Sequence, residues 1–109
     1  MPDHAILLAG FSFGAYVALR AAQSLSIKQL ITVAPPVNIF DFDDLQAPVA
    51  PWLVVQGRDD EIVDVAAVFQ WLEGFANVEC LSLDQAGHFF HGQLNLLQRQ
   101  IMHYFAAND

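Results

Sequence analysis

The sequence contains little cysteine and little positive charge. Cys80 is its single cysteine, so the chain forms no disulfide within itself. The apolar neighbours Val78, Leu81 and Leu83 predict that this thiol is buried and has no chemical role. Only four Lys and Arg oppose 12 Asp and Glu, which gives a net charge of −8. Because this charge repels phosphate backbones and anionic lipid surfaces, the composition argues against a nucleic acid or membrane partner.

Long apolar runs are also absent, and we expect no secretory leader. No stretch approaches the roughly 20 uninterrupted apolar residues of a membrane span. The segment Met1–His4 has no cationic region leading into an apolar run, so we expect a cytoplasmic protein. The chain is nevertheless 55% hydrophobic, with a mean hydropathy of +0.37, which excludes disorder. Its 109 residues allow at most one domain, spanning residues 1–109.

Apolar runs alternate with helical patterns along the whole chain. Four runs predict parallel strands that are buried on both faces, over residues 4–10, 30–34, 52–56 and 77–83. Three amphipathic segments predict helices over residues 14–24, 65–75 and 93–105. Residues 37–51 hold two prolines and several aspartates, and predict a loop. The order β-α-β-loop-β-α-β-α predicts an α/β fold with a parallel, doubly wound sheet.

The segment Gly10–Gly14 reads Gly-Phe-Ser-Phe-Gly and lies between the first predicted strand and the first predicted helix. In this context Gly-x-Ser-x-Gly predicts a nucleophile elbow, a turn so tight that it holds Ser12 in a strained conformation. The two glycines are expected to leave room for the neighbouring backbone. The five residues alone fit an ordinary Gly/Ser turn equally well, so the rest of the chain decides.

A serine nucleophile needs a base, and the base needs an acid to orient it. In α/β folds with a nucleophile elbow, the acid follows one later strand and the histidine follows the next. Asp60 follows the third predicted strand and His88 follows the fourth. Because parallel strands end at the same sheet edge, we expect both residues to lie beside Ser12.

With these motifs the chain resembles the α/β-hydrolase superfamily, and within it the small capless bacterial hydrolases related to dienelactone hydrolases. The resemblance covers residues 4–105. It rests on four segments in the family's order, Gly10–Gly14, Ala34–Pro36, Val55–Val63 and Gly87–Gly92.

The resemblance implies a serine hydrolase that acts on an ester or similar acyl substrate. Ser12 is then the nucleophile, His88 the base and Asp60 the acid that orients it, and the N–H of Phe13 is an oxyanion donor. Three aromatic residues are candidates for an acyl pocket, although aromatics beside a buried strand more often belong to the core: Phe11, Phe89 and Phe90. Acyl transfer by a triad needs no cofactor, and none is expected.

Neighbouring charged residues have plainer interpretations. Asp59 and Glu61 read as solvated loop acids, and Asp59 is the alternative acid if the loop register differs. His91 lies three residues beyond His88 and is expected to cap or line the site. No Cys, Asp or Glu at ligand spacing completes a metal site with these histidines, so no metal is expected.

The resemblance covers no counterpart of the family's N-terminal strands, because the expected nucleophile stands at residue 12, where the family has it near the middle of the chain. The loop that supplies a second oxyanion donor is among the missing parts, so we expect impaired activity. The first strand is expected to expose an apolar edge of Ile6, Leu7 and Leu8, which favours a homodimer. Two alternatives stay open: a non-catalytic truncated homologue that forms an oligomer, and one subunit of a two-chain hydrolase.

Overall fold

The computed structural model describes residues 6–108. These residues form four strands and three helices. The strands are β1 (Leu7–Phe11), β2 (Gln29–Val33), β3 (Trp52–Gly57) and β4 (Val78–Leu83). The helices are α1 (Phe13–Ala22), α2 (Val65–Leu72) and α3 (Leu94–Asn108).

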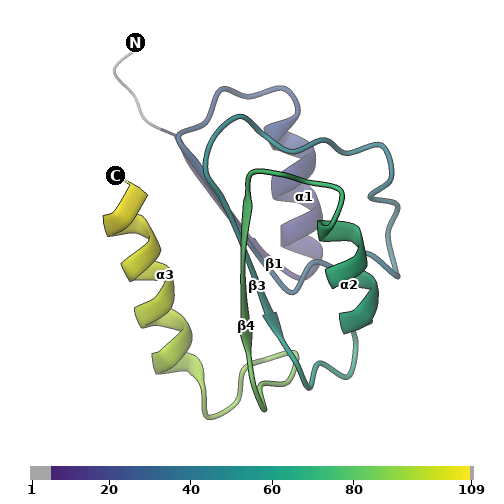
Figure 1. The fold of residues 1–109 in the computed structure, drawn as a ribbon, viewed down its shortest axis with the longest axis vertical. Coiled ribbons are helices and arrows are strands. Elements are labelled where there is room, and N and C mark those ends of the chain that lie inside the picture. The colour runs from purple at the N-terminus through teal and green to yellow at the C-terminus, as the bar shows by residue number, and fades with distance from the viewer. Residues whose placement is uncertain (1–5, 109) are drawn as a thin grey trace.

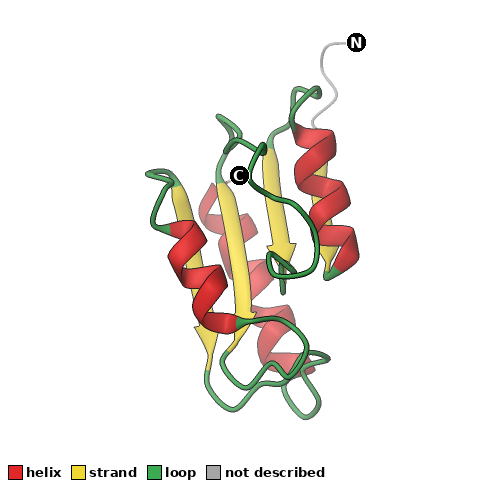
Figure 2. Cartoon of the chain, turned by 90° about the vertical axis from the view of Figure 1, so that its right-hand side faces the viewer, coloured by secondary structure: helices red, strands yellow, loops and turns green. Residues whose placement is uncertain are grey.

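All four strands are parallel and lie in the order β1-β2-β3-β4. Helices α1 and α2 cover one face of the sheet, and α3 covers the other (Figure 1). The predicted parallel, doubly wound α/β sheet is therefore confirmed. Figure 2 shows the four strands running in the same direction, so the loops that follow them gather at one edge. This edge is where the candidate site lies.

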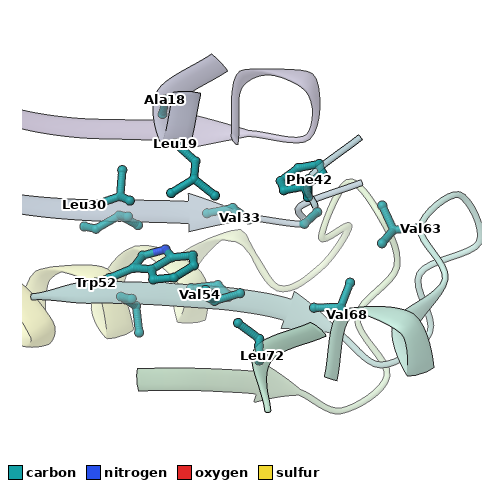
Figure 3. Packing of buried hydrophobic residues seen from close by; sticks show 14 of the residues in the cluster. Ala18, Leu19, Leu30, Val33, Phe42, Trp52, Val54, Val63, Val68 and Leu72 are labelled. Carbon is teal, nitrogen blue, oxygen red and sulfur yellow. The ribbon is translucent and has the colours of Figure 1, made fainter. Parts of the chain in front are cut away.

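The register of β2 and β3 determines which of their side chains face helices α1 and α2. Leu30 lies beside Trp52, and Thr32 lies beside Val54, so all four face the same side. The side chains of Leu30, Trp52 and Val54 pack against residues of α1 and α2 (Figure 3). The indole N–H of Trp52 is buried, and it donates to the Thr32 hydroxyl at 3.0 Å. The pairing removes the cost of an unsatisfied donor in the core.

The ends of the elements differ from the predictions by a few residues. Residues 4 and 5 of the predicted first strand lie outside the described residues. Helix α2 starts after Asp64, whose side chain caps the first turn by accepting from the N–H of Ala67 at 3.1 Å. It ends at Leu72 instead of residue 75, directly before the turn that contains Gly74. Helix α3 runs three residues further than predicted.

The two outer strands are partly exposed. On β1 and just before it, Ile6 and Leu7 are 42% and 39% exposed, whereas Leu8 is half-buried against the core. On β4, Cys80 is an exposed residue, so the prediction of a buried cysteine is wrong. An outer strand has a neighbour on one side only, which leaves its residues open to solvent. Within residues 6–108, no helix is long and apolar enough to cross a membrane.

Candidate active site

Ser12 occupies a single sharp turn between β1 and α1. Its backbone has φ 57° and ψ −117°, a conformation that non-glycine residues rarely adopt. The Ser12 N–H donates to the carbonyl of Val33 at 2.8 Å, which ties the turn to β2. Ser12 stands at the N-cap of α1, where a serine usually caps the helix through its hydroxyl. Here the hydroxyl makes no cap and is left for another partner.

The two glycines of the motif differ in their surroundings. A Cβ atom on Gly10 would lie 2.0 Å from the carbonyl oxygen of Gly14 and 2.7 Å from the backbone nitrogen of Ala15. Only glycine permits so close an approach of strand and helix. A Cβ atom on Gly14 would meet no atom within 4 Å. The expectation that both glycines make room is therefore right for Gly10 and wrong for Gly14.

The structure brings Ser12, Asp60 and His88 into one hydrogen-bonded chain. The Nδ1 atom of His88 lies 2.8 Å from Oδ2 of Asp60, and its Nε2 atom lies 3.0 Å from Oγ of Ser12. An ionised carboxylate only accepts, so Nδ1 carries the proton and Nε2 is free to accept from the serine. The side chain of His88 is 3% exposed and that of Asp60 is fully buried. Asp59, the alternative acid, is exposed, and the acid that contacts His88 is Asp60.

Asp60 is held as a carboxylate by the donors around it. Burial by itself raises the pKa of Asp60. The N–H of Val63, at 2.7 Å, and the ring of His88 oppose this effect. The N–H of Ile62 and the amide of Gln56 add to them, and the pKa of Asp60 falls below its ordinary value of 3.8. Asp60 is therefore ionised at neutral pH and able to stabilise a protonated His88.

Several known proteins share this fold. No model of a protein family matches the chain. The solved structure of XC6422 from Xanthomonas campestris, an α/β serine hydrolase without a lid, is 47% identical with a TM-score of 0.87, and the match covers 94% of this chain and 47% of that one. An α/β serine hydrolase homologue from Coxiella burnetii is 39% identical with a TM-score of 0.87, over 94% and 50% of the two chains.

The chain has the α/β-hydrolase fold. It spans about half the length of the hydrolases that it matches. An uncharacterized protein of Rickettsia prowazekii is 28% identical in an alignment 108 positions long, which covers 90% of this chain and 45% of that protein. The predicted resemblance to capless hydrolases, over part of their fold only, is thus confirmed.

In this hydrolase fold, Phe13 is the first residue of α1. The first N–H groups of a helix have no carbonyl partner inside it, and the helix end favours negative charge. The Phe13 N–H therefore has the position expected of an oxyanion donor next to Ser12. Its side chain is 57% exposed and packs against Phe40, with ring centroids 5.2 Å apart.

Two of the three predicted pocket aromatics lie beside the histidine. The ring centroids of Phe11 and Phe89 are 5.1 Å and 4.9 Å from that of His88. Both side chains are about half exposed, at 41% and 55%. Phe90 is different, because it is only 1% exposed and belongs to the core, and its φ is 56°. Of the two interpretations of Phe90, acyl pocket or core, its burial supports the core. His91 is exposed.

Sequence reasoning missed two side chains of the site. Gln56 is fully buried, and its Nε2 donates to Oδ2 of Asp60 at 3.2 Å. The signal for Gln56 was a polar residue inside an otherwise apolar strand, because buried polar groups need partners. Glu61 is not merely a solvated acid, since its Oε1 accepts from the backbone N–H of His88 at 2.8 Å. No sequence signal pointed to this contact across 27 positions.

A cavity of about 310 Å³ lies away from this site, at the opposite end of α1. Its walls include Gln23, Leu25 and Pro48, and Ser12, Asp60 and His88 are not among the residues that line it. Among the described residues, no group of three or more His, Cys, Asp or Glu could hold a metal ion.

Proposed function

We propose that this chain carries the nucleophile, base and acid of a serine hydrolase for esters or similar acyl substrates. The observation that supports the proposal best is the chain of contacts from Ser12 through His88 to Asp60, at 3.0 Å and 2.8 Å. Ser12 and His88 stand 76 positions apart in sequence, and both lie in tight turns after parallel strands. A structural turn needs no such alignment of a hydroxyl, an imidazole and a carboxylate.

The proposed reaction follows from these positions. Oγ of Ser12 attacks the carbonyl carbon of the ester, while Nε2 of His88 takes the hydroxyl proton. The N–H of Phe13 stabilises the negative oxygen that forms, and Asp60 stabilises the protonated imidazole. The C–O bond to the alcohol then breaks, and His88 returns the proton to the leaving alcohol. In the second half of the reaction, water gives a proton to His88 and attacks the acyl carbon. The bond between this carbon and Oγ of Ser12 then breaks, His88 returns the proton to Oγ, and the carboxylic acid is released.

One oxyanion donor is less than the fold normally uses. In this class of hydrolase a second N–H comes from the loop after an earlier strand. Loss of one donor costs on the order of 100- to 1,000-fold in rate. Because the chain matches about half of each relative, we propose slow turnover for these residues alone and faster turnover when a segment supplies the second donor.

The surface beside the histidine favours an apolar substrate group. Phe11 and Phe89 flank the His88 ring and stay half exposed. Burying their exposed rings against an acyl or alcohol group would stabilise the complex by the hydrophobic effect. We therefore propose a short-chain ester with an apolar or aryl portion as the substrate class.

The test is labelling by a fluorophosphonate, which reacts with an activated serine. We expect Ser12 of the wild type to be labelled and the label to disappear in Ser12→Ala and His88→Ala. Ser24→Ala is the matched control, because Ser24 is an exposed serine at the end of α1. If the folded wild type takes up no label, or labels equally after Ser12→Ala, the proposed catalysis is wrong.

A second proposal concerns assembly and rests on β1. This strand is the outer strand of the sheet, with Ile6 and Leu7 exposed beside it. An exposed apolar strand edge recruits another strand. We propose a homodimer that joins two β1 edges into one sheet. The alternatives are a non-catalytic oligomer that retains the triad residues, and a two-chain hydrolase in which another polypeptide pairs with β1.

A further inference from the structure

Glu61 contacts the same histidine as Asp60, from the next position in the chain. Oε1 of Glu61 accepts from the backbone N–H of His88 at 2.8 Å, while Oδ2 of Asp60 lies 2.8 Å from the ring nitrogen. Two adjacent acids thus hold one residue at two points, its backbone and its ring. With both points fixed, the imidazole has little freedom to turn away from Ser12.

The loop that carries His88 needs such a restraint. Gln85 and Phe90 both have positive φ, at 61° and 56°. Non-glycine residues keep this conformation only where the surroundings enforce it. One restraint is the carbonyl of Ala86, which accepts a backbone N–H from the loop after β3 at 3.0 Å. Glu61, in the same loop after β3, supplies a second restraint, which acts on His88, two residues after Ala86.

The Glu61 carboxylate packs against the backbone of Gly87, where a side chain would crowd it. A Cβ atom at Gly87 would lie 3.3 Å and 3.4 Å from the two carboxylate oxygens, which is closer than most such contacts. The absence of a side chain lets the carboxylate lie against the backbone just before His88. The hydrogen bond from the His88 N–H, followed by that from the N–H of Glu61 itself, lowers the pKa of Glu61 below its ordinary value of 4.5. Glu61 is therefore an ionised acceptor at neutral pH.

We infer that Glu61 is a positioning residue: by holding the backbone N–H of His88, it fixes the imidazole between Asp60 and Ser12. Glu61 acts through His88 and not on the substrate. The inference rests on the proposed function, because this placement matters for turnover only if His88 takes the proton of Ser12.

The first test reads the position of the imidazole without any substrate, by NMR of the His88 ring nitrogens. In the wild type we expect a slowly exchanging proton on Nδ1, protected by Asp60. Glu61→Ala should broaden this signal or shift it, because the loop is released. Glu61→Gln should keep the signal close to that of the wild type, because the amide oxygen still accepts. Asp59→Ala is the matched control, since it removes an exposed acid from the same loop.

Two results of this test overturn the inference. One is a His88 spectrum in Glu61→Ala that equals that of the wild type. The other is an equal change in Glu61→Gln and Glu61→Ala, which would assign the effect to charge instead of the hydrogen bond. Thermal unfolding establishes that each variant is folded. If Glu61→Ala does not fold, Glu61→Asp replaces it, because the shorter side chain reaches the His88 N–H less well.

The second test measures the rate of fluorophosphonate labelling at Ser12 in the same variants. We expect Glu61→Ala to slow labelling about tenfold, the value of one lost hydrogen bond to a charged group, and Asp59→Ala to leave it unchanged. An unchanged rate in Glu61→Ala overturns the inference. If the wild type itself takes up no label, the proposed function fails, and the NMR test still decides whether Glu61 positions His88.

Discussion

The two glycines of the elbow should respond oppositely to alanine. Gly10→Ala places a methyl group 2.0 Å from a backbone oxygen of α1, where no side chain is available to move aside. Overpacking a core costs about 1–3 kcal/mol when side chains can adjust, and more where they cannot. We expect Gly10→Ala to lower the free energy of unfolding by at least about 3 kcal/mol. This is a large share of the roughly 5–15 kcal/mol typical of a domain.

Gly14→Ala is the matched control within the same five residues. Its new methyl group meets nothing within 4 Å, and Gly14 lies in α1 without a positive φ. Alanine favours a helix over glycine by up to about 1 kcal/mol. We therefore expect Gly14→Ala to be neutral or to stabilise the protein by up to about 1 kcal/mol, and to keep the contact between Ser12 and His88.

Urea unfolding followed by tryptophan fluorescence measures both changes, since Trp52 is buried in the core. In thermal unfolding, Gly10→Ala should lower the Tm by more than about 10 °C, and Gly14→Ala should raise it by at most a few degrees. Equal stability of Gly10→Ala and Gly14→Ala would refute the close approach of β1 and α1 on which the elbow depends.

Two further predictions concern acid and assembly. The pKa of Asp60 is lower in the folded protein than its ordinary value of 3.8, so Asp60 stabilises the fold above that pH and ceases to do so as the pH falls through the lowered value. In Asp60→Asn, the free energy of unfolding from urea titrations should therefore fall less steeply below about pH 4 than in the wild type. An equally steep fall in both proteins would contradict the lowered pKa of Asp60. Leu7→Lys places a charge on the β1 edge and should shift the mass in light scattering from dimer to monomer. A wild type that is monomeric at micromolar concentration would exclude the β1 dimer.

The sheet and the meeting of Ser12, Asp60 and His88 could be predicted from the sequence for one physical reason. Apolar runs and helical periodicity determine the alternation of strands and helices, and parallel strands send every following loop to the same edge. The motif around Ser12 and the loops of Asp60 and His88 then meet without any further information. The hydrogen-bonded contact of these three side chains is thus encoded mainly by their order along the chain.

The remaining features of the site depend on how the loops run in space. Glu61 and His88 meet across 27 positions because of the path of two irregular loops, which no periodicity describes. Phe90 has a positive φ and is buried, although its neighbour Phe89 is exposed. Gln56 was within reach of sequence reasoning, since one buried amide among apolar strand residues implies a polar partner.

For the proposed reaction, the groups that transfer the proton and those that stabilise the oxyanion come from different parts of the fold. Ser12, His88 and Asp60 all lie within one run of parallel strands, so their contacts need no other part of a hydrolase. The second oxyanion donor of this fold class comes from a loop near an earlier strand. Attack on either an ester or a fluorophosphonate places negative charge on an oxygen that the oxyanion donors stabilise. The fluorophosphonate is the more reactive electrophile, so its reaction with Ser12 relies less on these donors than ester turnover does. We therefore expect fluorophosphonate labelling of this chain to be slowed less, relative to a longer homologue, than its ester turnover is. The difference between the two effects would measure what the other half of the fold contributes to catalysis.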